Sequence, residues 1–458
     1  MKLRLKPPVQ WASSPLLTLL LALLALLAFL PLGAAERPNF LIIFTDDLGY
    51  GDVSTYQDSD CQTPHLDQLA KEGLLFTAMR ANCTVCSPSR AALLTGKNAD
   101  CVGVPGVIRS DKKNSWGYFD PAARTLADEL NAAGYHSAAI GKWHLGLEAE
   151  NHPNKRGFTH FHGFLGDMMD DYYTHRRRGE NLMRLNGETI TPKGHATELF
   201  SDWAISYFAE RAEKKDEPFF LYLAYNAPHF PIQPPAEWLE KVKQRRPDLP
   251  AKRAANVAFV EHLDHEIGRV LAALEKEGLA ENTLVAFASD NGGSIPHAQS
   301  NKPWREGKQW HYDGGLRTPF TLRWPAKIPA GSTSDYAGLN FDLFPTFLEL
   351  AGAKPTADLD ARSLVPLLNG GEMPQQRELY FVRREGGSRF GGQAYHALIS
   401  GDWKLLRNNP YQPLELYHLA DDPQEKNNLA SQRKDLMKKL APRLQHHIQR
   451  GGATPWQK

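Results

Sequence analysis

The chain has 458 residues, which is long enough for one large domain and a smaller one. Its 53 basic and 52 acidic side chains nearly cancel, so the formal net charge of +1 provides no bulk attraction to a polyanion such as nucleic acid. The hydrophobic fraction of 42% is that of an ordinary globular protein. We therefore expect a folded protein whose partners do not include nucleic acid.

Residues 1–35 have the pattern of a signal peptide. Three basic residues among the first six are followed by an apolar run at residues 16–30, and small residues at 33–35 fit a cleavage site. We therefore expect this segment to be removed and the protein to be exported, to a periplasm or beyond. The apolar run is shorter than the roughly 20 residues of a membrane span, so no stable span is expected after cleavage, with an uncleaved anchor as the alternative.

Four apolar runs of strand length each end close to residues that can carry chemistry. The predicted strands cover residues 40–44, 137–140, 219–225 and 284–288. The side chains that follow them are, in the same order, Asp46 and Asp47, Lys142 and His144, His229, and Asp290 and Asn291. Because such runs alternate with helical patterns, we expect an α/β fold with a mostly parallel sheet. Ligands of such sheets bind at the carboxyl ends of the strands, so these side chains are expected to share one site.

The acidic pairs among these side chains indicate a metal site. Three carboxylates and an amide oxygen are available, from Asp46, Asp47, Asp290 and Asn291. Hard oxygen ligands suit Ca²⁺ or Mg²⁺, whereas a zinc site would favour histidine or thiolate. Carboxylates crowded at buried strand ends also repel one another unless a cation lies between them. Helix capping and turn formation are the alternative roles of either pair taken alone.

The sequence Cys86-Ser87-Pro88-Ser89-Arg90 predicts a helix that begins near its cysteine. Pro88 fits a first helical turn, where its missing N–H costs nothing, and residues 91–94 can continue the helix. Cys86 would then lie near unpaired backbone N–H groups and the positive end of the helix dipole, which favour anions. A packed structural cysteine is the alternative interpretation.

This stretch, with the Leu93-x-Thr95-Gly96 that follows it, resembles the signature of the type I, formylglycine-dependent sulfatases. The acidic pairs at 46–47 and 290–291, with the glycines near them, are similar to the metal motifs of that family. The resemblance extends from about residue 37 to the C-terminus. It implies an alkaline-phosphatase-like fold, with a mostly parallel central sheet flanked by helices and a small C-terminal antiparallel α+β subdomain.

The resemblance also implies a chemistry for each candidate residue. A formylglycine-generating enzyme would convert Cys86 to an aldehyde, whose hydrate would attack the sulfur of a sulfate ester. One calcium ion, with magnesium as the alternative, would be held by Asp46, Asp47, Cys86, Asp290 and Asn291. The catalytic residues would be Cys86, Arg90, Lys142, His144, His229 and Lys308. Those that also bind substrate would be Lys142, His229 and Lys308.

Two histidines and a lysine have more specific expected roles. His144 is expected to accept a proton from the hydrate, and either His229 or Lys308 to donate one to the leaving oxygen. Lys302 competes with Lys308 for the lysine position, but the distance from the following Gly-Gly turn favours Lys308. Asp313 stands where sulfatases usually show glutamate, and no role is assigned to it.

We expect the catalytic domain to cover residues 36–355 and the C-terminal subdomain to cover residues 356–458. In the latter, the sequence predicts strands at 397–399, 403–406 and 414–419, a hairpin turn at Gly401-Asp402, and a helix at 431–449 that is kinked or interrupted near Pro442. The four cysteines include Cys86, which leaves at most one disulfide if that residue is converted. Cys61 with Cys101 and Cys83 with Cys101 both remain open.

The sequence thus predicts an exported hydrolase of sulfate monoesters on carbohydrates, or of aryl sulfates. One alternative is a phosphate or phosphonate ester hydrolase of the same superfamily, whose zinc-dependent members use histidine ligands and a serine or threonine nucleophile. Another alternative is a sulfated-glycan binding protein that has lost catalysis.

Several residues near the predicted site could contact a glycan. Aromatic residues on predicted loops could stack on sugars or simply pack in the interior: Tyr172, Tyr173, His175, Trp304, Trp310 and His311. The basic run Arg176-Arg177-Arg178 is either a solvated loop or a contact to an acidic substrate.

Overall fold

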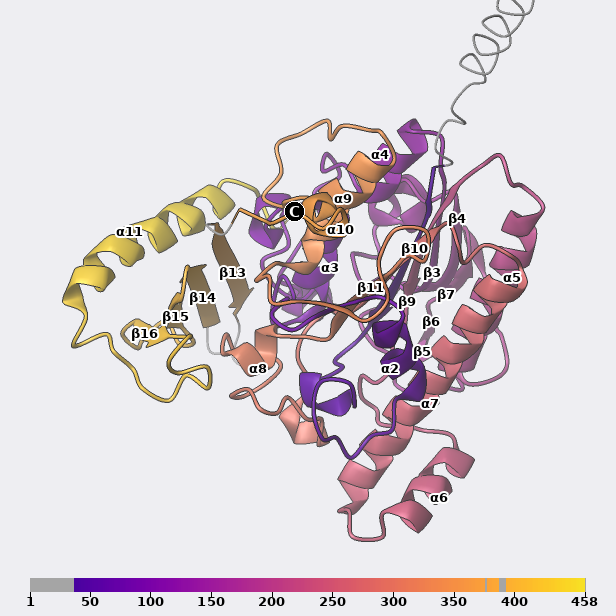
Figure 1. Cartoon of the computed structure of the whole chain (residues 1–458), viewed down its shortest axis with the longest axis horizontal. Coiled ribbons are helices and arrows are strands. Elements are labelled where there is room, and N and C mark those ends of the chain that lie inside the picture. The colour runs from indigo at the N-terminus through magenta and orange to yellow at the C-terminus, as the bar shows by residue number, and fades with distance from the viewer. Residues whose placement is uncertain (1–36, 375–376, 387–392, 458) are drawn as a thin grey trace, which may run out of the picture. The chain divides into compact units, whose positions relative to one another are not determined.

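The structure is a computed structural model that describes residues 37–374, 377–386 and 393–457 (Figure 1). The predicted signal peptide at residues 1–35 lies outside these ranges. Within them, no helix has both the length and the apolar character needed to cross a membrane.

A ten-stranded mixed sheet forms the centre of the described chain. Its strands are β1 (Asn39–Thr45), β2 (Leu74–Phe76), β3 (His136–Lys142), β4 (His160–Phe164), β7 (Met183–Leu185), β8 (Glu188–Thr189), β9 (Phe219–Ala224), β10 (Thr283–Ser289), β11 (Phe320–Arg323) and β12 (Ser332–Ser334). They lie in the order β12-β2-β11-β10-β1-β9-β3-β4-β7-β8. The five strands from β10 to β4 in this order are parallel to one another, and antiparallel pairs join the outer strands to them on both sides.

The central strands form because their sequences are almost continuously apolar. All residues of β9 and β10 are buried, as are all but the first of β1. Such runs are typical of parallel strands that are covered on both faces. The four predicted strands are confirmed: residues 40–44, 137–140 and 284–288 lie within β1, β3 and β10, and β9 covers all but the last residue of 219–225.

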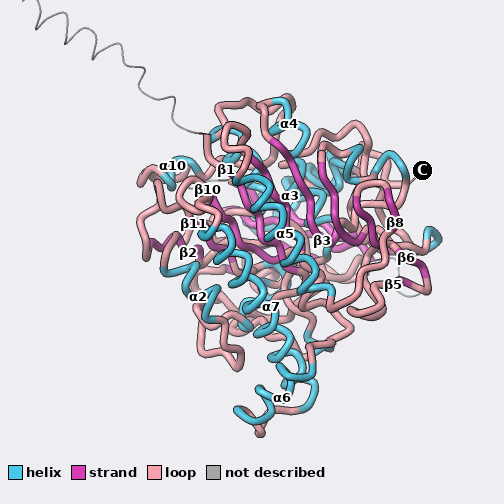
Figure 2. The backbone as a smooth tube through the Cα atoms, turned by 90° about the vertical axis from the view of Figure 1, so that its right-hand side faces the viewer, coloured by secondary structure: helices cyan, strands magenta, loops and turns pink. Residues whose placement is uncertain are grey.

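Helices cover both faces of the sheet. The helices of this part of the chain are α2 (Pro64–Lys71), α3 (Cys86–Thr95), α4 (Leu126–Ala132), α5 (Ala196–Ala212), α6 (Ala236–Arg245), α7 (Ala251–Lys276), α8 (Asp313–Leu316), α9 (Leu343–Leu350) and α10 (Val365–Leu368). Figure 2 shows α2, α5 and α7 in front of the strands. On the other face α3, α4 and α9 pack together, and Phe347 of α9 stacks on Phe40 of β1 with ring centroids 4.2 Å apart. The sheet is therefore the middle of three layers.

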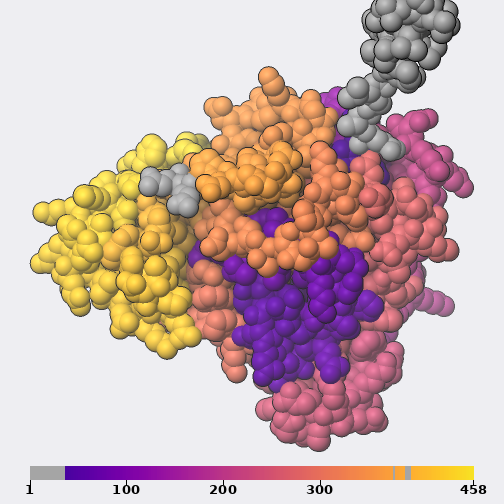
Figure 3. Space-filling model, viewed as in Figure 1, coloured from indigo at the N-terminus to yellow at the C-terminus, as the bar shows by residue number. Residues whose placement is uncertain are grey.

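A second, antiparallel sheet follows in the chain, with strands in the order β13 (Glu378–Glu385), β14 (Gln393–Ser400), β15 (Trp403–Arg407) and β16 (Glu415–His418). The predicted hairpin between β14 and β15 and the strand at β16 are confirmed. The amphipathic helix α11 (Lys434–Gly451) packs on β14 and β15 through Leu440 and Leu444. In the space-filling view, the yellow surface of this part adjoins the surface of the segments before it (Figure 3).

Of the two alternatives predicted for the last helix near Pro442, the interruption is wrong, because α11 continues through this residue, and the kink stays a prediction. Pro442 is exposed, so water can bind the carbonyl group that loses its helical N–H partner. The predicted domain boundary at residue 355 stays a prediction.

The start of α2 is capped from another helix. Thr63 precedes α2 without capping it, and the buried Asp264 of α7 instead accepts hydrogen bonds from the backbone N–H groups of His65 at 3.1 Å and Leu66 at 2.8 Å. Such bonds satisfy two of the N–H groups that every helix start leaves unpaired.

We expect Asp264→Ala to lower the free energy of unfolding by about 1–3 kcal/mol, because the backbone N–H groups of His65 and Leu66, the latter buried, lose a carboxylate acceptor. Urea denaturation measures the change. Asp264→Asn keeps one acceptor oxygen and should lose less. An alanine variant as stable as the wild type would contradict the capping role.

Candidate active site

The carboxyl ends of β1 and β10 bring the two acidic pairs side by side. Thr45 lies opposite Ser289 in the parallel register, so the residues that follow each strand are neighbours. The backbone N–H of Asp47 donates to the Asp290 carboxylate at 3.2 Å. Asp47 itself has a φ of 67°, a left-handed conformation that few residues other than glycine, asparagine and aspartate adopt readily. The chain therefore turns sharply where the two strand ends meet.

The amide of Asn291 is oriented by its neighbours. Its Nδ2 donates to Asp47 Oδ1 at 2.8 Å and to the carbonyl of Gly292 at 2.9 Å. Its Oδ1 is buried and has no hydrogen-bond partner among the described residues. A buried oxygen without a partner is costly, so this atom is a suitable ligand for a cation.

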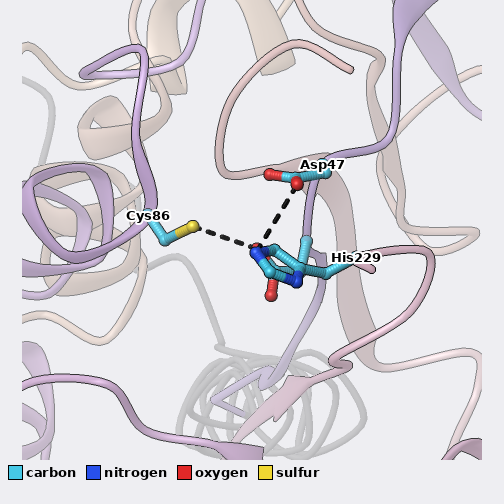
Figure 4. A group of neighbouring side chains, drawn as sticks. Asp47, Cys86 and His229 are labelled. Carbon is cyan, nitrogen blue, oxygen red and sulfur yellow. Dashed lines mark hydrogen bonds and ion pairs between the residues drawn. The ribbon is translucent and has the colours of Figure 1, made fainter. Parts of the chain in front are cut away.

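Cys86 is the first residue of α3, and its thiol points into the acidic cluster. The Sγ atom donates to Asp46 Oδ1 at 3.2 Å and lies 3.5 Å from the Nζ of Lys308. Figure 4 shows the Cys86 and Asp47 side chains directed towards the imidazole of His229. Burial, reinforced by the negative charge of Asp46, raises the pKa of this thiol well above its usual value. As a thiol, the side chain is therefore a poor nucleophile here.

Arg90 follows Cys86 by one helical turn and reaches back to the same carboxylates. Its Nε and one terminal nitrogen donate to Asp290 Oδ2 at 3.1 and 2.8 Å, and its other terminal nitrogen donates to the Tyr222 hydroxyl at 3.2 Å. The guanidinium is fully buried. Burial, followed by the charge of Asp46, raises the pKa of Asp290 to about 7. Arg90 opposes that rise and fixes the orientation of the carboxylate.

Two lysines complete the charge balance of the cluster. The ammonium group of Lys142, at the end of β3, forms an ion pair with Asp46, and that of Lys308 lies 2.6 Å from Asp47 Oδ1. Burial alone would raise the pKa of Asp46, but Lys142, supported by His229 and Arg90, holds it well below its usual value. Lys302, the competing candidate, lines a different cavity. The structure therefore places Lys308, not Lys302, beside Cys86.

The two predicted histidines are held by backbone carbonyl groups. The Nε2 of His144 lies 2.8 Å from the carbonyl of Ile108, and its buried Nδ1 has no partner among the described residues. The Nδ1 of His229 lies 2.6 Å from the carbonyl of Phe230, and its Nε2 faces Asp47 Oδ2 at 3.7 Å. Burial, with Lys142, lowers the pKa of His144 well below its usual value, and burial, with Lys308, lowers that of His229 to about 4.

These side chains form a compact set of potential metal ligands. Ligand atoms of Asp46, Asp47, Cys86 and His229 all lie within 4.8 Å of one another. The unpartnered Oδ1 of Asn291 belongs to the same cluster through its bond to Asp47. The carboxylate oxygens and the amide oxygen fit the hard-ligand prediction, and Asp290 lies beside them, where it accepts a hydrogen bond from the backbone of Asp47. His229, predicted as a catalytic residue and not as a ligand, also lies within the set, and it and the Cys86 thiol are ligand types that zinc would favour.

A cavity of about 440 Å³ opens onto this cluster. Cys86, His144, His229 and Lys308 form part of its wall. Its remaining wall includes four residues that no sequence pattern indicated, Arg109, Asp167, His297 and Glu385, together with Arg177. Of these, only Arg177 was noticed, within a basic run, and in the structure it forms two hydrogen bonds of 2.8 and 2.9 Å with Asp167.

The aromatic residues proposed as sugar contacts lie elsewhere. None of these six described residues lines the cavity: Tyr172, Tyr173, His175, Trp304, Trp310 and His311. Tyr172 is buried, and its hydroxyl lies 2.8 and 2.9 Å from the carbonyl groups of Asn226 and His229, so it positions the loop that carries His229. For Tyr172, His175 and His311, which are all buried, interior packing is the role that the structure supports.

The proposed disulfides are not formed. Cys61, Cys83, Cys86 and Cys101 are all free thiols. Cys83 donates to the carbonyl of Val382 at 3.0 Å, and Cys61 donates to Asp52 at 3.8 Å, so each thiol is engaged in a separate environment.

Comparisons with known proteins agree with this geometry. The family model described as Sulfatase matches residues 38–353, and that described as N-sulphoglucosamine sulphohydrolase, C-terminal, matches residues 304–450. The dog N-acetylgalactosamine-6-sulfatase is 33% identical over 76% of this chain and 69% of its own length. Human arylsulfatase A is 33% identical over 90% of this chain and 86% of its own length.

Among solved structures, the crystal structure of Ps i-CgsB in complex with k-i-k-neocarrahexaose superposes with a TM-score of 0.83. It is 29% identical and covers 92% of this chain and 95% of the other. The fold and the site thus define a hydrolase of anionic esters that is built on a mixed α/β sheet. The chain belongs to the sulfatase family, and it is an enzyme that hydrolyses sulfate esters.

We expect Arg90→Lys to lower kcat for an aryl sulfate by about 10²-fold, because a lysine cannot make both hydrogen bonds to Asp290. Steady-state kinetics measures the effect, with circular dichroism to confirm folding. A folded variant with wild-type kcat would show that the paired contact is dispensable.

Proposed function

We propose that this protein is an exported sulfatase that removes sulfate from carbohydrates, using a formylglycine made from Cys86 and one calcium ion. One observation carries the proposal. Cys86 begins a buried helix, with its sulfur 3.2 Å from Asp46 and 3.5 Å from Lys308 and with Arg90 one turn further on. A functional group at this position can meet an anionic ester in a site that is rich in cations.

The modified side chain would supply, as its hydrate, the hydroxyl nucleophile that the neutral thiol cannot. The cations around it stabilise the negative charge that develops on sulfate oxygens, and they do so most strongly in a buried site. Arg90, Lys142 and Lys308 have this role, with Lys142 and Lys308 also binding the substrate sulfate. Arg90 also acts indirectly, because its hydrogen bonds fix the orientation of the Asp290 carboxylate.

Proton movement is assigned to the two histidines and Lys308. The contact of His144 Nε2 with the Ile108 carbonyl leaves the Nδ1 lone pair of a neutral imidazole available, so His144 accepts a proton from the nucleophile. His229 and Lys308 line the cavity on the side of Asp47, where either can protonate the leaving oxygen. Histidine is the better acid of the two near neutral pH once a bound anion stabilises its charged form.

Calcium is favoured by the chemistry of the ligands. Asp46, Asp47, Asp290 and Asn291 offer oxygen atoms, with position 86 completing the set, and a bound divalent cation would polarise the sulfate group. The unpartnered Oδ1 of Asn291 supports this assignment.

A carbohydrate substrate is supported by the relatives. N-acetylgalactosamine-6-sulfatase is named for a sulfated sugar, and the similar Ps i-CgsB structure contains a neocarrahexaose. Export is supported by the N-terminal sequence pattern. A phosphate ester hydrolase of the zinc-dependent kind would have a serine or threonine nucleophile, and this chain has Cys86 at that position instead.

The aldehyde can be tested directly. Trypsin releases residues 81–90, which contain both Cys83 and Cys86, and we expect fragmentation mass spectra to place an aldehyde at residue 86 and a thiol at residue 83 when the protein is produced with a formylglycine-generating enzyme. Cys86→Ala should lower kcat for an aryl sulfate by about 10³-fold or more. The matched control Cys83→Ser should retain activity. A fully active protein with an unmodified thiol at 86, or one that prefers aryl phosphate, would refute the proposal.

Metal dependence distinguishes calcium from magnesium. We expect EGTA to abolish hydrolysis of an aryl sulfate and CaCl₂ in excess over EGTA to restore it. MgCl₂ should restore little, because Mg²⁺ demands a near-ideal octahedral shell and keeps several waters, so that it suits a set of protein ligands poorly. Calorimetric titration of the stripped protein should show one calcium site, weakened by Asn291→Ala. Activity that survives complete chelation would rule the ion out.

A further inference from the structure

A second cavity, of about 370 Å³, lies beside the cavity that contains Cys86, and the catalytic roles assigned above make no use of it. The loop at residues 107–109 separates the two cavities. Val107 lines the first, Ile108 the second, and Arg109 lines both. A ligand seated in the first cavity thus has a neighbouring space across a single side chain.

Arg109 lies between the two cavities and is held in place by hydrogen bonds. One terminal nitrogen donates to Glu385 Oε2 at 2.8 Å, and the other donates to the carbonyl of Asn114 at 3.1 Å. Its backbone N–H donates to the Ser115 hydroxyl at 3.2 Å. The side chain is only 14% exposed, so these contacts, which include the ion pair with Glu385, hold the guanidinium at a defined place between the cavities.

The wall of the second cavity combines hydrogen-bonding groups with an aromatic ring. Ser110, Tyr118 and Glu148 provide polar atoms, and the exposed Lys112 adds a positive charge. Trp456 lies on the same wall, with its ring centroid 5.4 Å from that of Trp116. A sugar offers hydroxyl groups at its edge and an apolar face, so this mixture suits a sugar ring.

Trp456 is brought to this wall by tertiary contacts. The segment after α11 returns to the catalytic part of the chain, where the Thr454 hydroxyl donates to the carbonyl of Cys101 at 3.1 Å. Pro455 lies against Gly103, where a side chain would come within 2.8 Å of the proline carbonyl oxygen. Glycine is required at 103 because its φ is 77° and because a side chain there would also come within 2.3 Å of the Tyr118 carbonyl oxygen.

We propose that the second cavity is a subsite for the sugar next to the one that carries the reacting sulfate, and that the substrate is therefore a sulfated oligosaccharide or polysaccharide rather than a monosaccharide. The inference rests on the proposed function and adds the size and charge of its substrate. Lys112 attracts a sulfate or carboxylate on that neighbouring sugar, and Trp456 packs on its ring.

The test compares substrates of increasing length. We measure kcat/KM for p-nitrophenyl sulfate, for sulfated monosaccharides, and for disaccharides and tetrasaccharides with the same sulfated end, prepared from carrageenan and chondroitin sulfate. The ratio of kcat/KM for the best oligosaccharide to that for its monosaccharide should be about tenfold or more, as expected for one added aromatic and ionic contact.

The variants locate the effect. Lys112→Ala and Trp456→Ala should each lower the ratio of oligosaccharide to aryl sulfate kcat/KM about five- to tenfold, whereas Trp456→Phe retains most of it. Lys113→Ala removes the same charge from an exposed neighbour that lines neither cavity, and it should leave the ratio unchanged. Equal kcat/KM at all lengths, or equal losses on every substrate, would overturn the subsite. Absence of activity on every one of these sulfate esters, oligosaccharides included, would instead refute the proposed function.

Discussion

The site depends on the pairing of buried charges at the ends of parallel strands. Three carboxylates lie in the interior, and each has a cation of its own: Arg90 for Asp290, Lys142 for Asp46 and Lys308 for Asp47. A buried carboxylate left without its partner costs several kcal/mol, so the segments that supply the cations cannot dock in another register. The same pairing that fixes the fold at this point also orients the groups around Cys86.

The C-terminal sheet is tied to the catalytic part by a second buried network. Asp313 accepts two hydrogen bonds from Arg80, at 3.1 and 2.7 Å, and pairs with Lys404 of β15 at 2.9 Å. Lys404 also pairs with Glu425 at 2.8 Å. Asp313 therefore has a structural role, and the short aspartate side chain suits the space between Arg80 and Lys404. Because β13 also supplies Glu385 to the cavity wall, the small sheet contributes to the site as well as packing beside it.

The central strands and the charged cluster could be predicted from the sequence, because both have strong local patterns. Continuous apolar runs identify buried parallel strands, and polar residues just beyond them lie at one edge of the sheet. The strands β2, β11 and β12, of three or four residues each, are too short for such a pattern to identify them, and their neighbours in the sheet position them. Arg109 and Asp167 belong to loops whose position is set by tertiary contacts, and the separation of the cysteines is likewise a property of the folded chain. These features could not be predicted from the sequence alone.

The burial of α3 sets an order of events in the life of the protein. All ten of its residues are buried, and Cys86 retains only 2% of its accessible surface. A modifying enzyme needs to hold several residues around its target, and the folded chain offers it none of this helix. Any conversion of Cys86 must therefore occur while the polypeptide is still extended, during synthesis or export, and a copy that folds first is committed to remain a thiol.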